Sequence, residues 1–197
     1  MFMSTKLALV SMKVSDAISQ RRSIKKFTGR AVTREDIEAL LDAAVLAPNH
    51  KLTQPWRFYV LGPIARRQYG LAQGDCKAKK LPDADAANAV REKTGQEYHA
   101  FPALIAVATV VAESAETREE DYAAVMQSIA LITLVAMERG LGTHIRTGAV
   151  MDDPAARAAI GVREGERVVA LIAVGVPEEI PAPKARQRAP AVTEWRE

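Results

Sequence analysis

The chain has 197 residues, of which 48% are hydrophobic and 26% charged, the balance of an ordinary globular domain. Its formal net charge is only +3, and acidic and basic residues alternate along most of it, which argues against a nucleic-acid-binding module. The single cysteine, Cys76, excludes an internal disulfide framework, and the three widely spaced histidines argue against a metal site.

The amino-terminal segment contains one short apolar run, Leu7 to Val10, which is too short for the core of a signal peptide. We therefore expect a cytoplasmic protein with no membrane partner. Residues 1–12 are predicted to be a frayed extension, followed by a single domain over residues 13–197.

A basic and polar cluster follows, with the sequence Arg21-Arg22-Ser23-Ile24-Lys25-Lys26-Phe27. The two arginines can offer bidentate donors to a phosphate, the serine a hydroxyl, and Lys25 a point charge. Taken alone, the pattern is more typical of a solvated helix end, where cations interact with the helix dipole.

The next segment predicts a helix, a polar loop and a strand. Thr33 and Asp36 resemble a capping box, and an apolar face at helical spacing follows until Pro48 ends the helix. The loop from Ala47 to Phe58 holds two prolines, Asn49, His50 and Gln54. A rigid loop explains the prolines and aromatics but not the closely spaced polar side chains. Residues 56–61 are rich in strand formers.

Residues 64–99 are polar and charged and predict helical pieces that pack loosely over the rest of the domain. They are also our candidate for a mobile lid over the site. Residues 103–112 and 168–176 are nearly continuous apolar runs, which predict strands buried on both faces.

Residues 122–137 are apolar nearly all round and predict a helix. The run is shorter than the roughly 20 apolar residues of a membrane span, so a core helix is favoured, and burial between two subunits would explain the missing polar face. Gly140 suits a left-handed helix end. A short strand near Thr143 and a helix over 153–161 follow, and the proline-rich tail, 177–197, is expected to wrap over this subunit or another.

A second polar cluster, His144-Ile145-Arg146-Thr147-Gly148, could supply a matching set of anion donors. The chain has no dinucleotide-binding glycine fingerprint, no phosphate loop and no nucleophile elbow. We therefore expect no catalytic side chain, and anion binding is the chemistry that remains.

Three motifs in order carry a family resemblance. Arg-Arg-Ser-Ile-Lys-Lys-Phe, then Ala-Pro-Asn-His-Lys-Leu-Thr-Gln-Pro-Trp-Arg-Phe, then Arg-Gly-Leu-Gly with Ile-Arg-Thr-Gly resemble the nitroreductase family of FMN flavoproteins, in its short, minimal branch. The resemblance runs from about Asp16 to Pro177. It implies an α+β fold with a small, mainly antiparallel sheet flanked by helices, in an intertwined homodimer with FMN at the interface.

The resemblance also implies a cofactor site. The positions that match the family's FMN contacts are Arg21, Arg22, Ser23, Lys25, Leu46, His50, Ile145, Arg146 and Thr147. The first four match the segment that binds the FMN phosphate, ribityl chain and ring edge, with Lys25 as the first candidate for the cation beside the reducible ring and Arg21 as the second. Arg146 matches a second phosphate contact, with Ile145 and Thr147 beside it. Leu46 and His50 match positions that reach the flavin of the other subunit, although a basic residue is expected at position 46.

The implied activity is an FMN-dependent NAD(P)H oxidoreductase, in which the cofactor carries the chemistry. NAD(P)H gives a hydride to FMN and leaves, and a nitroaromatic, quinone or similar small-molecule acceptor takes its place. The same fold also supports dehalogenation, dehydrogenation and flavin breakdown, and a non-catalytic flavin-binding module is a further alternative.

Overall fold

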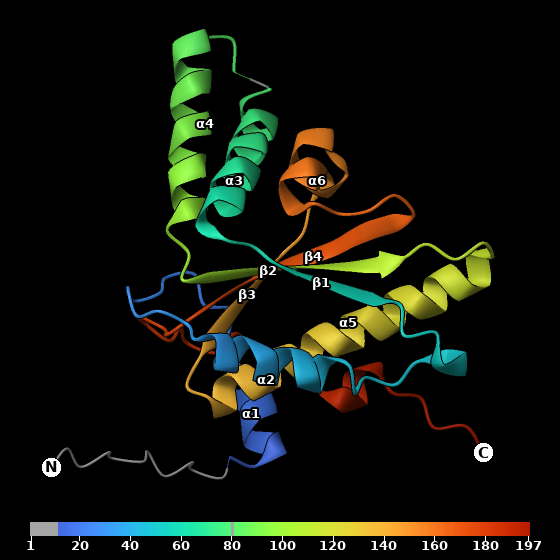
Figure 1. Cartoon of the computed structure of the whole chain (residues 1–197). Coiled ribbons are helices and arrows are strands. Elements are labelled where there is room, and N and C mark those ends of the chain that lie inside the picture. Colours follow the sequence, from blue (N-terminus) through green and yellow to red (C-terminus); the bar gives the residue numbers. More distant parts are fainter. Residues whose placement is uncertain (1–11, 80) are drawn as a thin grey trace, which may run out of the picture.

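The fold is built on a four-stranded sheet in which every neighbouring pair of strands is antiparallel (Figure 1). The computed structural model describes residues 12–79 and 81–197, so the extension expected at 1–12 lies outside the described residues except for Met12. The strand order is β1–β2–β4–β3. The strands are β1 (Trp56–Val60), β2 (Ala103–Val110), β3 (Gly142–Arg146) and β4 (Glu166–Gly175). This topology confirms the predicted α+β class with a small antiparallel sheet.

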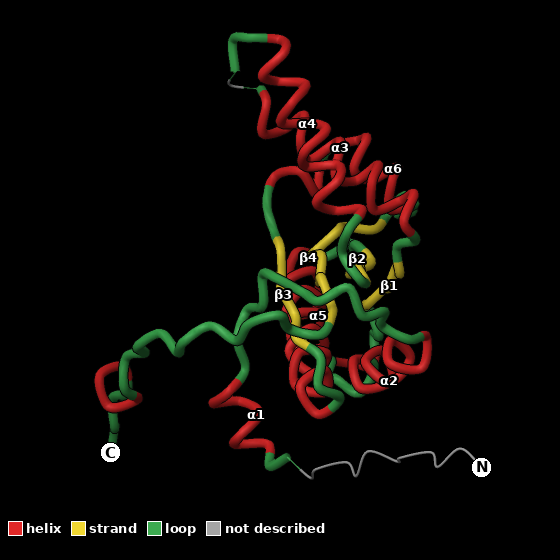
Figure 2. The backbone as a smooth tube through the Cα atoms, turned by 90° about the vertical axis from the view of Figure 1, so that its left-hand side faces the viewer, coloured by secondary structure: helices red, strands yellow, loops and turns green. Residues whose placement is uncertain are grey.

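Helices cover both faces of the sheet (Figure 1, Figure 2). On one face α5 packs against the strands and α2 packs on α5, with α1 beside α5. On the other face α3 packs against α6, and α4 packs along α3. The helices are α1 (Val14–Gln20), α2 (Arg34–Ala44), α3 (Pro63–Ala78), α4 (Ala84–His99), α5 (Ala115–Glu138) and α6 (Pro154–Ile160).

Strand β2 shows why the sequence contains continuous apolar runs. Its side chains alternate between the two faces, so Ile105 and Val107 enter the core under α5, while Leu104 and Ala106 enter the core under α3 and α6. All four are fully buried. A strand covered by helices on both faces needs no polar side, which confirms the prediction of doubly buried strands.

Helix α2 begins and ends where its sequence signals indicate. The Thr33 hydroxyl accepts a hydrogen bond from the Asp36 backbone N–H at 3.0 Å, and the Asp36 carboxylate accepts one from the Thr33 backbone N–H at 3.2 Å. These reciprocal bonds form the predicted capping box. The helix buries Ile37, Leu40 and Ala44.

Helix α5 is longer than expected, because it begins at Ala115 rather than near Tyr122. Its first turns are mostly acidic and lack the apolar spacing that marks a helix in sequence, but Ser114 caps them by accepting from the Thr117 N–H at 3.0 Å. Gly140 has a φ of 69°, which confirms the left-handed helix end. Within the described residues α5 is the one helix long and apolar enough to cross a membrane, yet it packs on the sheet as a core helix does.

Helices α3 and α4 form a closely packed hairpin, so the expectation of loose helical pieces is wrong. A Cβ added at Gly74 would lie 2.5 Å from the Arg91 Cα, and one at Gly70 would lie 2.7 Å from the Tyr98 Cβ. Glycine is therefore required at these crossings, because any side chain would meet the neighbouring helix. The polar composition of this segment reflects the outward faces of two helices that pack against each other.

The tail follows β4 and is largely exposed. The backbone of Pro177 pairs with Phe27, and the Glu179 carboxylate lies 3.4 Å from the Lys26 ammonium. From Glu178 onward every residue is exposed, including a short 3-10 turn, η3 (Ala189–Val192). Figure 2 shows this segment extending away from the helices and the sheet. Within one chain the tail therefore covers little surface.

Candidate functional site

The first polar cluster lies directly beside strand β3. Ser23 pairs with Thr143 in a parallel bridge, and the Ile24 N–H donates to the Thr143 carbonyl at 2.9 Å. Ile24 is buried, and its side chain fixes the segment against Gly142, where an added Cβ would lie 2.4 Å from it. The fold thus brings together two motifs that are far apart in the sequence.

A cavity of about 680 Å³ opens beside this segment. Arg21, Arg22, Ser23 and Lys25 all line it, as the sequence predicted for one site. Lys184 and Arg186 of the tail line it as well, and sequence reasoning missed them. The available signal was the run of cations in Lys184-Ala185-Arg186-Gln187-Arg188, but nothing local indicates that this run folds back toward Arg21.

Arg22 is held by the end of helix α1. Its Nη1 donates to the carbonyls of Ser19 at 2.8 Å and of Arg21 at 2.9 Å, which satisfies acceptors at the helix end. Its Nε is buried and has no hydrogen-bond partner among the described residues. A buried N–H without a partner is costly, so this atom is a donor that a bound anion could satisfy.

The second polar cluster is divided between the two faces of the sheet, because β3 alternates. Ile145 packs toward the core under α5, whereas the Arg146 side chain points to the face of α4. The Arg146 guanidinium donates to one oxygen of Glu97 through both Nη atoms, at 3.1 Å each. It also lies 4.6 Å from the ring centre of Tyr98 and 5.3 Å from that of Phe101. Arg146 does not line the 680 Å³ cavity, so the phosphate contact implied for it stays a prediction.

His144 is where the two clusters meet. Burial lowers the pKa of this imidazole, the positive charges of Arg146 and Lys25 lower it further, and Glu97 partly opposes them. The side chains of Lys25, His144 and Arg146 are therefore close enough to interact electrostatically. Lys25 takes part in both clusters, since it lines the cavity and its charge also lowers the pKa of His144. Thr147 follows them and is exposed.

Leu46 and His50 lie elsewhere. The Leu46 side chain is 79% exposed beyond the end of α2, and His50 begins a 3-10 turn, η1 (His50–Leu52). Figure 1 shows this turn on the side of the molecule opposite to the segment between α1 and α2 that carries the first cluster. Within one chain the fold does not bring these two positions to the cavity.

The loop that carries His50 has an unusual backbone. Lys51, Leu52 and Gln54 all have positive φ, at 53°, 54° and 44°, which side-chain-bearing residues rarely adopt. Contacts to α5 hold it, because His50 Nδ1 lies 2.9 Å from a Glu120 oxygen and the Thr53 hydroxyl donates to Asp121 at 2.6 Å. Such strain persists only where the surroundings enforce it, and it concentrates at functional sites.

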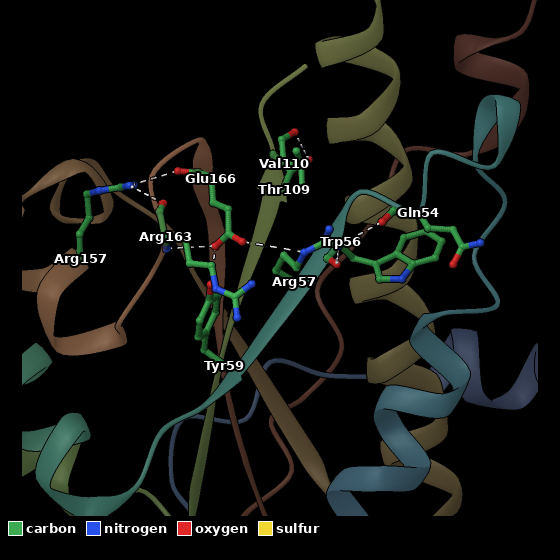
Figure 3. Close-up of polar contacts among 9 residues, drawn as sticks. All are labelled: Gln54, Trp56, Arg57, Tyr59, Thr109, Val110, Arg157, Arg163 and Glu166. Carbon is green, nitrogen blue, oxygen red and sulfur yellow. Dashed lines mark hydrogen bonds and ion pairs between the residues drawn. The ribbon is translucent and has the colours of Figure 1, made fainter. Parts of the chain in front are cut away.

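Arg57 holds the carboxyl-terminal end of the same loop in place (Figure 3). Its guanidinium donates to the Gln54 carbonyl at 3.2 Å, and its Nε lies 3.9 Å from Glu166. The buried Glu166 carboxylate also accepts from the Tyr59 hydroxyl and from the Arg163 backbone N–H. Burial and this hydrogen bond to a carboxylate raise the pKa of Tyr59. The group connects the loop to β1 and β4 and has a structural role.

Comparisons with known proteins bear on the family and the fold of the chain. The model of the nitroreductase family matches residues 18–176. YfhC, a protein of Bacillus subtilis that carries the name NAD(P)H nitroreductase, is 31% identical over 176 residues, which cover 89% of this chain and 89% of YfhC. A nitroreductase-like family protein from Bacillus cereus has a similar structure, with a TM-score of 0.81, 28% identity, and 95% and 98% of the two chains covered. A nitroreductase with bound FMN from Bacteroides fragilis shares the fold at a TM-score of 0.72 and 21% identity, over 95% of this chain and 100% of that one.

Proposed function

The chain belongs to the nitroreductase family, and we propose that it uses FMN to carry electrons from NAD(P)H to a nitroaromatic, a quinone or a similar small acceptor. The observation that carries this proposal is the cavity that Arg21, Ser23 and Lys25 share with Lys184 and Arg186. Its cations come from two distant parts of the chain and converge on one space.

The residues of this cavity fit a phosphate monoester. Arginine and lysine side chains surround it, and Glu179 is the one carboxylate among the residues that the described chain contributes to its lining. Glu179 is itself paired with Lys26 at 3.4 Å, so it leaves the other cations free to bind an anion. A dianionic phosphate would receive several charge-assisted hydrogen bonds here, and the buried Arg22 Nε offers one more donor.

Bound FMN would supply reversible two-electron chemistry, which the described side chains cannot perform themselves. Lys25 lines this cavity and its charge also reaches His144; it would stabilise the negative charge that develops on the flavin on reduction. Burial, together with the charges of Arg146 and Lys25, lowers the pKa of His144, which favours the neutral form of this imidazole. Overall, NAD(P)H and one proton from solvent would convert a nitro group to a nitroso group and one water, leaving NAD(P)+.

The functional unit in this proposal is a homodimer with FMN at the interface. The support is that apolar side chains are exposed on α1, at the end of α2 and in the η1 turn, where a single chain leaves Val14, Ile18, Leu46 and Leu52 in water. Helix α5 also exposes Ala123 and Ala130 between its buried positions. A second copy would cover these side chains and would bring its own Leu46 and His50 to the cavity of the first.

The experiment is a flavin and turnover assay on the purified protein. We expect a yellow protein whose extracted cofactor is FMN, and which oxidises NAD(P)H steadily when nitrobenzene or a benzoquinone is added. A colourless protein that fails to bind added FMN would contradict the proposal. Loss of flavin under oxygen without acceptor turnover would instead indicate flavin breakdown.

A further inference from the structure

A second cavity, of about 500 Å³, lies between helix α2 and the first turn of helix α3, beside the end of the edge strand β1. We call it the α2–α3 cleft. Among the described residues it shares no lining side chain with the 680 Å³ cavity assigned to FMN. Its volume is within the range of about 300–1,000 Å³ that is typical of sites for small molecules. The cleft is therefore a separate candidate for ligand binding.

The walls of the α2–α3 cleft are largely apolar. Ile37 and Leu41 line it from α2, Val60 from the end of β1, and Pro102 from the residue before β2. The Val60 side chain is 52% exposed. A ligand with a hydrocarbon body would cover this side chain and remove apolar surface from water, which favours binding.

Arg66 is the unpaired cation of the cleft. Its half-buried side chain makes one hydrogen bond, from Nη1 to the Pro102 carbonyl at 3.3 Å, and within the described chain it forms no ion pair. Its Nε is buried and has no hydrogen-bond partner, a property that it shares in the described chain only with Arg22 of the FMN cavity. Burial lowers the pKa of Arg66, yet an arginine keeps its charge in a protein. A half-buried charge without a counterion is unfavourable, so an anionic ligand would stabilise it.

The other charged side chains at the cleft already neutralise each other. Arg34 and Glu38 form an ion pair at 2.6 Å, and their side chains are 91% and 56% exposed. Glu38 is therefore committed to a partner in water and does not compensate Arg66. The next residue along α3 shows the contrast, because Arg67 pairs with Glu92 at 2.8 Å.

We propose that the α2–α3 cleft binds a small monocarboxylic acid with an apolar body, whose carboxylate pairs with Arg66. One guanidinium matches one negative charge and can donate to both carboxylate oxygens. A dianionic phosphate would keep an uncompensated charge beside the apolar walls, and a neutral ligand would leave Arg66 unpaired. The inference goes beyond the proposed function, which requires no ligand at this cleft.

The test compares three probes, hexanoate, hexanamide and acetate, by NMR titration of the full-length protein with and without added FMN. Hexanamide has the same chain without the charge, and acetate has the charge without the apolar body. Hexanoate should bind roughly tenfold or more tightly than either, because each of the others lacks one of the two interactions.

Substitutions in the cleft separate the two interactions. Arg66→Gln should raise the Kd for hexanoate roughly tenfold or more and leave that for hexanamide unchanged. Arg67→Gln is the matched control, since it removes the same charge from the adjacent residue, which is outside the described lining of the cleft. Val60→Ser should weaken hexanoate and hexanamide alike, by roughly threefold. If Arg66→Gln does not fold, Val60→Ser carries the test.

Four results would overturn the inference. The first is equal affinity for hexanoate and hexanamide, or hexanoate binding that Arg66→Gln and Val60→Ser leave unchanged. The second is binding of inorganic phosphate as tightly as hexanoate, which would make the cleft a general anion site. The third is displacement of FMN by hexanoate, which would place the probe in the other cavity. The fourth is absence of hexanoate binding, as expected if a second copy of the chain covers the cleft.

The titration also distinguishes failure of this inference from failure of the proposed function. It requires no flavin and no turnover, so a protein that binds hexanoate through Arg66 but does not bind FMN would defeat the proposed function alone. An FMN-loaded protein that NAD(P)H reduces, and that does not bind hexanoate, would defeat this inference alone.

Discussion

At the scale of single residues, Lys25 connects the two halves of the candidate site. It lines the cavity with Arg21 and Ser23, and its charge also acts on His144 of strand β3. The family resemblance implied Lys25 as the cation nearest the reducible ring, and this role stays a prediction. The cations of the tail, Lys184 and Arg186, were outside any prediction because only the folded chain brings them to Arg21.

Substituting cavity cations should weaken flavin binding. Arg21→Ala and Lys184→Ala each remove a charge-assisted partner of the phosphate, worth about 1.5–3 kcal/mol, so FMN affinity should fall roughly tenfold or more. Flavin content after extensive dialysis, and the dissociation constant for added FMN, measure the effect. Arg30→Ala is the control, since Arg30 is exposed near the same segment but does not line the cavity. Equal flavin retention in all three variants would show that this cavity does not bind the FMN phosphate.

His144 should make folding stability depend on pH. Burial, Arg146 and Lys25 lower its pKa in the folded chain, whereas an unfolded chain has the ordinary value of about 6.5. Below about pH 6.5 the unfolded chain therefore binds protons that the folded chain does not, so stability falls as pH drops toward the folded pKa. The side chain introduced by His144→Gln does not titrate. The free energy of unfolding of this variant should therefore fall less than that of the wild type as the pH drops over this window.

The measurement is urea unfolding of both proteins at several pH values. The difference between the two curves should stay constant above about pH 7, where His144 is neutral in both states, and change below about pH 6.5. A difference that is flat across the whole range would show that His144 has the same pKa folded and unfolded.

At the scale of elements, prediction succeeded where signals are local. Thr33 and Asp36 cap α2, Pro48 follows its end, and Gly140 ends α5, so neighbouring residues determine those boundaries. The start of α5 escaped prediction because its acidic first turns are stabilised by the Ser114 cap rather than by an apolar face. The close packing of α3 on α4 was also missed, since a glycine such as Gly74 shows its role only against its neighbour.

The α3–α4 contact predicts the effect of one methyl group. Gly74→Ala places a Cβ 2.5 Å from the Arg91 Cα, and backbone cannot move aside as a side chain can. The gain in helix propensity is about 1 kcal/mol, but overpacking costs about 1–3 kcal/mol, and a backbone clash lies at the upper end. We expect net destabilisation in urea unfolding. Gly62→Ala is the control, because an added Cβ there meets nothing within 4 Å. Equal stability of the two variants would contradict the close packing.

At the scale of the whole molecule, a single chain holds only part of the proposed site. Its cavity lies beside β3, while Leu46 and His50 lie on the far side, next to exposed apolar side chains such as Leu52. The apolar character of α5 predicted burial between subunits, but the sequence alone could not tell which surfaces meet. The strained loop that carries His50 is held by Asp121, Glu120 and Arg57, which suits a segment presented to another chain.

The proposed homodimer predicts that loss of assembly and loss of flavin are linked. The native protein should have twice the 21.4 kDa mass of one chain by size exclusion with light scattering. Leu46→Glu places a charge where a partner would cover it, so the variant should shift toward the mass of a single chain and retain less FMN. A variant that remains a dimer with full flavin content would show that Leu46 lies outside the interface.

The central claim is that this protein binds FMN and that NAD(P)H reduces it there. The most direct measurement is the visible spectrum of the FMN-loaded protein under anaerobic conditions, before and after addition of NADH or NADPH. We predict that the yellow flavin absorbance bleaches with at least one of the two donors and returns when para-nitrobenzoate or a quinone is added. A flavin spectrum that neither donor changes would contradict the account.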